Sequence, residues 1–286
     1  MVGPQQGPQQ GPQQNPQDGP HLDADTVAPA RRYDYLRGGK DNFAADRAAG
    51  DAMRELFPDI GVTLAENRNL VLRVVRHLAT TCGVRQFVDI GFGIPQGPCV
   101  HDVAQAADPT ARVLYVDNDP LVLVHGRALM LSHPAGKVDF LQGDVLDPGS
   151  ILASTAYRDL IDPGEPVALL LFAVLHFIDD DTRVLRAVRT LIEALPAGSY
   201  LAVSHGTTDF LTPDQLSIAA RLLDDPRQGT LRPRTQDQIA ALLTGLELVD
   251  PGIVATIRWH PELDPAPAPH LGDTAASVYA ALARKP

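Results

Sequence analysis

The chain has 286 residues, of which 44% are hydrophobic, so it can bury a full apolar core and is not disordered throughout. A formal net charge of −11 argues against a nucleic-acid duplex or a membrane surface as the partner, because such binding needs a basic face. Two cysteines are too few for a disulfide scaffold, so we expect a soluble protein of the reducing cytoplasm.

Residues 1–27 form a repeat of distinct composition. Prolines recur at positions 4, 8, 12, 16 and 20 among glutamines and glycines, with almost no apolar side chains to offset the entropy of ordering. We expect this segment to be a disordered tail. It lacks the basic and apolar blocks of a secretion signal, and no apolar run in the chain reaches the roughly 18 residues of a membrane span.

Residues 28–84 are expected to form an N-terminal helical cap. Apolar side chains recur at helical spacing over 41–56 and 63–81. Before them, the stretch from Tyr33 to Phe43 mixes aromatic residues, glycines and polar groups, which favours a lid over the ligand site. In that lid two tyrosines would line the reaction cavity, and Arg37 or Lys40 would meet a ligand carboxylate. The alternative is a packed helix that ends at a glycine pair.

Residues 85–286 are expected to form the ligand-binding core. Apolar strands are predicted over 86–90, 112–116, 138–141, 166–176 and 198–205, and helices over 97–107, 120–132, 149–157 and 180–195. This alternation predicts a parallel sheet with helices on both faces. Helices over 213–223 and 235–244 then lead to a strand-like stretch, 246–259, broken by Pro251 and Gly252, and to a final strand over 277–284.

The glycine turn after the first strand predicts a nucleoside cofactor site. The first strand ends at Asp89, and Gly91 and Gly93 form a turn after it that lets the backbone approach a ligand closely. The second strand ends in Asp117, whose carboxylate can accept both ribose hydroxyls. A dinucleotide site would place its third glycine at the start of a helix, to hold a pyrophosphate. Here a proline stands at that start and the third glycine comes one place late, which weakens this interpretation.

The same residues resemble the cofactor motifs of class I S-adenosylmethionine methyltransferases, with a third match in Asp144, which follows the third strand. Several longer segments resemble, more narrowly, the actinobacterial S-adenosyl methyltransferase family once catalogued as a domain of unknown function: 32–47, 66–68, 116–120 and 171–177. The resemblance implies S-adenosylmethionine as cofactor, and an α/β, Rossmann-like fold with a mostly parallel seven-stranded sheet, an antiparallel last strand and an N-terminal helical cap.

We therefore predict that Asp89 holds the methionyl amino group, Asp117 the ribose and Asp144 the adenine. The predicted cofactor-binding residues are Asp89, Gly91, Gly93, Asp117, Asn118, Asp144, Val145 and Phe172. Asp144 has turn chemistry as its alternative role, and Asp119 is expected to cap a helix. The Glu66-Asn67-Arg68 motif belongs to the resemblance, although its place within a helix predicts a solvated face.

The candidate catalytic residues are His176 and Tyr33. His176 is expected at the end of the fourth strand and His205 at the end of the fifth, the edge where ligands bind in such sheets. His176 is the better candidate base, whereas His205 favours a structural role. No metal is expected, since no cysteine or histidine cluster has zinc spacing and Asp179–Asp181 favours a helix start.

These features predict a methyltransferase that acts on a small molecule. The fourth strand lacks the Asn/Asp-Pro-Pro-aromatic signature of enzymes that methylate nucleic-acid bases, so a nucleic-acid substrate is disfavoured. Two alternatives stay open, a non-catalytic S-adenosylmethionine-binding protein and an NAD-dependent oxidoreductase. The sequence does not specify the acceptor or the oligomeric state.

Overall fold

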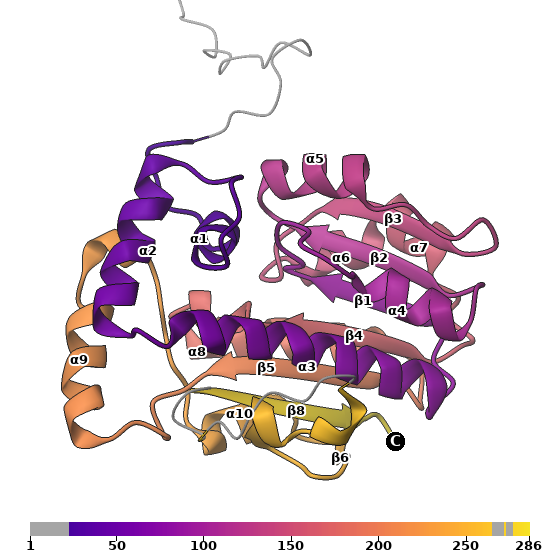
Figure 1. The fold of residues 1–286 in the computed structure, drawn as a ribbon. Coiled ribbons are helices and arrows are strands. Elements are labelled where there is room, and N and C mark those ends of the chain that lie inside the picture. The colour runs from indigo at the N-terminus through magenta and orange to yellow at the C-terminus, as the bar shows by residue number, and fades with distance from the viewer. Residues whose placement is uncertain (1–22, 265–271, 273–276) are drawn as a thin grey trace, which may run out of the picture.

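The computed structural model describes residues 23–264, 272 and 277–286, so most of the predicted tail lies outside the described residues. Its centre is a sheet of eight strands in the order β3-β2-β1-β4-β5-β8-β6, with β7 also paired to β8 (Figure 1). The strands are β1 Gln86–Ile90, β2 Arg112–Asp117, β3 Lys137–Gln142, β4 Val167–Phe172, β5 Tyr200–Gly206, β6 Glu247–Leu248, β7 Val254–Ala255 and β8 Val278–Arg284. The first five run parallel, and β8 is antiparallel to its neighbours. The predicted α/β fold is confirmed.

The late strands explain why the sheet has eight strands rather than the predicted seven. The strand-like stretch is interrupted at Pro251 and Gly252, as the sequence indicated, and β6 and β7 lie on either side of the break. Each half pairs separately with β8. Proline lacks the N–H that a continuous ladder would need, so the two halves count as two strands.

The helices begin and end close to the predicted positions. They are α1 Pro29–Leu36, α2 Ala44–Leu56, α3 Ile60–Thr80, α4 Val100–Ala107, α5 Pro120–Leu129, α6 Pro148–Ala153, α7 Thr155–Leu160, α8 Asp181–Ala194, α9 Pro213–Leu223 and α10 Gln236–Leu242, with 3₁₀ turns at η1 Leu175–Phe177, η2 Pro226–Gln228, η3 Thr256–Arg258 and η4 Pro261–Leu263. Asp119 caps α5 by accepting the Leu121 N–H at 2.9 Å, as predicted. Asp180 caps α8 in the same way, which confirms that the acidic run starts a helix.

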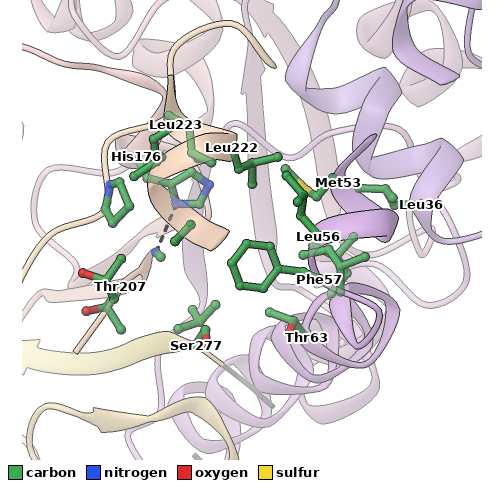
Figure 2. Close-up of a pocket in the computed structure, with 18 of the residues that line it drawn as sticks. Leu36, Met53, Leu56, Phe57, Thr63, His176, Thr207, Leu222, Leu223 and Ser277 are labelled. Atoms are coloured by element: carbon green, nitrogen blue, oxygen red, sulfur yellow. Dashed lines mark hydrogen bonds between the residues drawn. The ribbon is translucent and has the colours of Figure 1, made fainter. Parts of the chain in front are cut away.

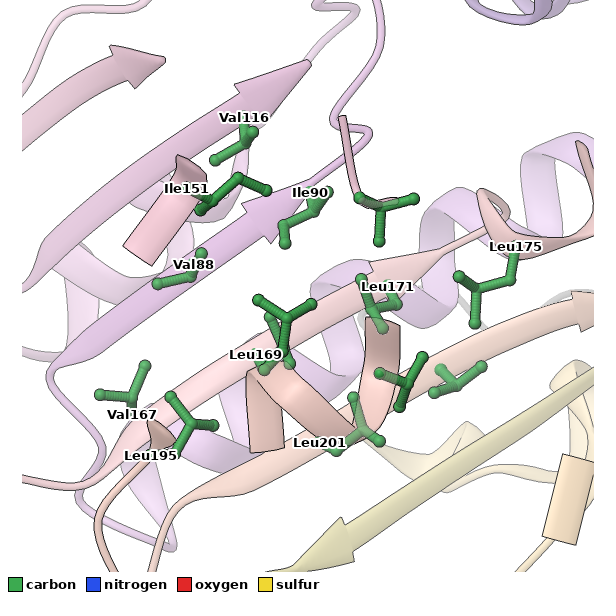
Figure 3. Close-up of a cluster of buried hydrophobic side chains, with 14 of the residues drawn as sticks. Val88, Ile90, Val116, Ile151, Val167, Leu169, Leu171, Leu175, Leu195 and Leu201 are labelled. Atoms are coloured by element: carbon green, nitrogen blue, oxygen red, sulfur yellow. The ribbon is translucent and has the colours of Figure 1, made fainter. Parts of the chain in front are cut away.

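Two apolar cores lie on opposite faces of the sheet, because successive strand side chains point to opposite faces. In β4, Leu169 and Leu171 pack on one face with α6, α7, α8 and α10 (Figure 3). Ala168 and Leu170 pack on the other face with α3 and α4. All six residues of β4 are buried, as expected of a central parallel strand. The sheet is therefore a rigid base for the loops at its carboxyl edge.

Three helices lie beyond the carboxyl ends of the parallel strands. Figure 1 shows α1, α2 and α9 at this end, whereas α3 runs along the sheet, where it contacts β4, β8 and α4. Within the part of the chain that the structure describes, no helix is long and apolar enough to cross a membrane.

Candidate functional site

A cavity of about 340 Å³ opens where β1, β2 and β4 end. Side chains and loops that are far apart in the sequence meet here, since carboxyl ends of parallel strands share one edge. The predicted cofactor residues all line this cavity, which we call the first cavity: Asp89, Gly91, Gly93, Asp117, Asn118, Asp144, Val145 and Phe172. The candidate catalytic Tyr33 lines it as well.

The glycine turn after β1 has the backbone conformation that its sequence predicts. Gly91 and Gly93 have φ angles of 77° and 69°, in the left-handed region that side chains other than glycine rarely adopt. A Cβ on Gly91 would also lie 2.7 Å from Val174, whereas one on Gly93 would meet nothing within 4 Å. The turn thus brings bare backbone to the wall of the cavity.

Asp117 is fixed by the backbone around it. Its Oδ2 accepts the Gly93 N–H at 3.1 Å, and its Oδ1 accepts the Asp119 N–H at 3.0 Å. Burial raises the pKa of Asp117 to about 6, although these N–H donors oppose the shift. The carboxylate therefore links the two loops that follow β1 and β2, in the place predicted for the ribose.

Asp89 and Arg68 put opposite charges in the same cavity. Burial raises the pKa of Asp89 to about 7; Arg68 opposes this shift and Asp117 adds to it. Arg68 donates from Nη2 to the Pro98 carbonyl, while its buried Nε has no hydrogen-bond partner among the described residues. A zwitterionic amino acid group, with its ammonium at Asp89 and its carboxylate at Arg68, would satisfy both.

Among the basic residues considered, Arg68 lines the first cavity, whereas Arg37 and Lys40, suggested from the sequence, do not. Arg37 lies over the Tyr33 ring, 5.9 Å from its centroid, and Lys40 is exposed. The solvated face predicted for the Glu66-Asn67-Arg68 motif is wrong, because Glu66 and Asn67 are buried. Burial depends on how α3 packs against α1 and the sheet, which helical spacing alone does not reveal.

The remaining predicted cofactor residues complete the wall. Val145 and Phe172 are buried apolar side chains. Asp144 is exposed, and its Oδ1 accepts the Leu146 N–H at 2.8 Å, which is the turn chemistry considered as its alternative role. Its other oxygen leaves Asp144 able to accept a further hydrogen bond at the cavity.

A second cavity of about 380 Å³ lies beside the first, between the sheet edge and helices α1, α2 and α9. Its wall is mostly apolar and includes Leu36, Met53, Leu56, Phe57, Leu222 and Leu223 (Figure 2). His176, Thr207 and Ser277 lie together at one end of it. We call this the second cavity; its volume and lining suit a small organic molecule.

The two cavities share a wall made of Pro29, Tyr33, Asn67, Ala173 and Phe177. Tyr33 donates its hydroxyl proton to the Leu64 carbonyl at 2.8 Å and accepts a weaker bond from Asn67 at 3.4 Å. Burial raises the pKa of Tyr33, so its phenol stays neutral and is not a base. The predicted second tyrosine, Tyr35, lies elsewhere and donates to Asp51 at 2.6 Å.

His176 lines the second cavity, but it does not lie on a strand as predicted. β4 ends at Phe172, and Ala173, with a φ of 53°, turns the chain into η1, which contains His176. The Nδ1 atom accepts the Gly206 N–H at 3.2 Å, which leaves the proton of the neutral ring on Nε2 (Figure 2). Burial, with His205, Arg32 and Arg234 nearby, holds the pKa of His176 well below its usual range. This arrangement suits a hydrogen-bond donor better than the general base expected from the sequence.

His205 has the structural role that the sequence favoured. Its Nδ1 donates to the Gly206 carbonyl at 2.8 Å, and its Nε2 accepts from Arg234 at 2.9 Å. Burial lowers the pKa of His205 to about 4, so the ring stays neutral. Both ring nitrogens are engaged within the protein, which leaves neither for a substrate.

One group of metal-ligand residue types escaped the sequence analysis. Cys99, His101 and Asp102 have ligand atoms within 4.8 Å of one another at the start of α4. Asp102 accepts the Cys99 N–H at 2.7 Å, and His101 Nδ1 lies 2.9 Å from the Tyr115 hydroxyl. These bonds cap the helix and tie it to β2, which explains the cluster without a metal.

A family model described as S-adenosyl methyltransferase matches residues 15–286. A crystal structure of a DUF574 family protein from Streptomyces avermitilis MA-4680 shares 44% identity over 92% of this chain and 99% of that chain, with a TM-score of 0.86. A second crystal structure, of a protein from Thermobifida fusca YX provisionally described as a methyltransferase, shares 39% identity over 92% and 96%, with a TM-score of 0.81. No curated protein matches the chain.

Proposed function

The chain belongs to the S-adenosyl methyltransferase family, and from this premise we propose that it moves a methyl group from the first cavity to a small-molecule acceptor in the second. It is an S-adenosylmethionine-dependent methyltransferase, and its acceptor is unidentified. The family match argues against the NAD-dependent alternative, and the second cavity, sized for an acceptor, argues against the non-catalytic one. The observation that carries the proposal is the shared wall between two cavities, the first lined by several charged side chains and the second mostly by apolar ones.

The residues of the first cavity can be matched one by one to the parts of S-adenosylmethionine. The guanidinium of Arg68, which lines the cavity, would bind the methionyl carboxylate, and Asp89 would bind the methionyl ammonium. Asp117 would accept the ribose hydroxyls, and Asp144 would contact the adenine. When bound, the cofactor supplies a methyl group on a sulfonium sulfur, which an aligned nucleophile can attack directly.

The protein's part in the transfer is alignment and exclusion of water. Tyr33 is held by Leu64 and Asn67 at the shared wall, so its ring orients the two ligands without exchanging a proton. Asn67 is itself held, because its Oδ1 accepts from Ser204 Oγ at 2.6 Å. His176 would donate from Nε2 to a polar group of the acceptor. In this proposal Tyr33 and His176 are the catalytic residues.

The proposal also covers the domain organisation of the chain, its cellular location and the kind of partner that it binds. We propose that residues 28–84 form the N-terminal helical segment, in which α1 and α2 cap residues 85–286 beyond the strand ends while α3 packs along the sheet. A cytoplasmic location is supported by the free thiols of Cys82 and Cys99. The net charge of −11 supports a partner other than nucleic acid or membrane.

Calorimetric titration tests the cofactor half of this proposal. We expect saturable binding of S-adenosylmethionine and S-adenosylhomocysteine and no saturable binding of NAD. Arg68→Gln should weaken both sulfur ligands, whereas Arg76→Gln, on the same helix but outside the cavity, should not. Equal binding by the two variants would remove Arg68 from the site.

A further inference from the structure

The second cavity contains a buried positive charge without an acidic partner. Arg32, on α1, is 4% exposed and lines the cavity. Its Nη1 donates to the backbone and side-chain oxygens of Gln228, at 2.7 and 3.0 Å, and both acceptors are neutral. The nearest acid to influence it, Asp46, pairs instead with Arg31 at 3.5 Å. Burial lowers the pKa of Arg32 to about 10, so it is charged at neutral pH.

The cavity offers little to balance that charge. Among the described residues that line it, the one carboxylate belongs to Asp59, which is exposed at the rim. Inside, His176 is a neutral hydrogen-bond donor. Among the described residues the interior is therefore mostly apolar, with one cation, the neutral donor His176, uncharged polar side chains such as Thr207 and Ser277, and no acid inside the rim.

Arg32 also lies close to the wall through which the methyl group would pass. Its guanidinium is 5.8 Å from the centroid of the Phe177 ring, and Phe177 lines both cavities. An anionic atom of a ligand next to this wall would face Arg32 and His176 together. An ammonium there would be desolvated beside a like charge, which is strongly unfavourable.

We propose that the acceptor is an apolar, ring-sized molecule with an acidic hydroxyl, a phenol or enol, and that its oxygen receives the methyl group. This inference rests on the proposed function. The hydroxyl releases its proton to water and binds as the oxyanion beside Arg32. An oxygen lone pair forms the new O–C bond, the S–C bond of the sulfonium breaks, and its electron pair stays on sulfur as S-adenosylhomocysteine. Aliphatic amines, which are ammonium ions at neutral pH, are disfavoured as acceptors.

The test uses the protein saturated with S-adenosylhomocysteine and two probes of matched ring size, 2-naphthol and 2-naphthylmethylamine. Calorimetry should show at least tenfold tighter binding of the naphthol. Tighter or equal binding of the amine, or no binding of either probe, would overturn the proposal. Failure of S-adenosylhomocysteine itself to bind would instead count against the proposed function, so the two failures are distinguishable.

Variants then assign the preference to Arg32. Arg32→Gln should weaken 2-naphthol at least tenfold and leave S-adenosylhomocysteine unchanged, which also shows that the variant is folded. Arg32→Lys should restore part of the binding, because it keeps the charge but not the planar fork. Arg221→Gln, exposed on α9, is the matched control. Unchanged naphthol affinity in Arg32→Gln would overturn the role of this charge.

Discussion

At the scale of single residues, the first cavity is lined by charged side chains that are not fully paired with one another in the free protein. Asp89 and Asp117 are both buried at the ends of neighbouring strands, and Arg68 lines the same cavity, where its charge acts on Asp89. Burial raises both carboxyl pKa values, which means that ionising them costs free energy until a ligand supplies a partner. The site is therefore arranged to gain more from a zwitterionic ligand than from an uncharged one.

Asp117→Ala tests the ribose contact. We expect it to weaken S-adenosylhomocysteine by about 1–3 kcal/mol, because buried hydroxyls lose their charged acceptor and the Gly93 N–H loses its partner. Calorimetric titration measures the change. Asp139→Ala, an exposed carboxylate on β3, should leave the affinity unchanged. Similar affinities for the two variants would place Asp117 outside the ribose site.

The raised pKa values also predict how stability and binding depend on pH. In the unfolded chain both carboxyls have the ordinary aspartate pKa of 3.8, whereas in the folded protein the pKa is about 6 for Asp117 and about 7 for Asp89. Between about pH 4 and 7 the folded protein binds more protons, so its free energy of unfolding falls as the pH rises, on the order of a few kcal/mol in total.

The cofactor reverses this dependence, because an ammonium at Asp89 favours the ionised carboxyl. We expect S-adenosylhomocysteine to bind more weakly as the pH falls below 7. Thermal unfolding from pH 5 to 8, with and without the ligand, measures both effects. Asp89→Asn should flatten both profiles, and a slope that is the same in this variant as in the natural protein would contradict the assignment.

At the scale of elements, the glycine turn after β1 is fixed by two different constraints. Position 93 requires glycine only because of its positive φ angle, since a Cβ there would meet nothing within 4 Å. Position 91 requires glycine for a second reason as well, because a Cβ there would lie 2.7 Å from Val174 in the loop after β4. The loops after β1 and β4 therefore fit against each other at the cavity wall.

Gly91→Ala and Gly93→Ala separate these constraints. Gly93→Ala should lower the free energy of unfolding by about 1–2 kcal/mol, the cost of a left-handed alanine. Gly91→Ala should cost about 1–3 kcal/mol more, because Val174 must also move. Urea denaturation of the two variants measures the difference. If both lose the same amount, the contact with Val174 does not constrain the turn.

The element scale also shows what the sequence could predict and what it could not. Apolar runs such as Val167–Phe172 and the glycine turn are local signals, so strands, topology and the cofactor loops were predictable. His176 was wrongly predicted to end the fourth strand, because the left-handed turn before it occurs at Ala173, and an alanine does not indicate such a turn in the sequence. The sequence did not single out Arg32 or Arg68 as site residues, because their place in the cavities depends on contacts of α1 and α3 with segments far along the chain.

At the scale of the whole molecule, α1 connects the cap to the cofactor loops. Arg31 lies 3.7 Å from Asp119, which caps the helix after β2. Asp34 accepts from Gln96, in the loop after β1. Pro29 and Tyr33 line both cavities. A ligand that orders the two loops should therefore order α1 as well.

Amide hydrogen exchange tests this coupling across the molecule. Saturating S-adenosylhomocysteine should slow exchange in α1 and in the loops after β1 and β2, while α10, which lines neither cavity, should keep its rate. Gln96→Ala removes the bond to Asp34 without touching the first cavity wall, so it should reduce the protection of α1 several-fold more than that of the loops. If α1 exchanges at one rate with and without the ligand while the loops are protected, the cap is independent of the cofactor, and Tyr33 is positioned before the ligand arrives rather than by it.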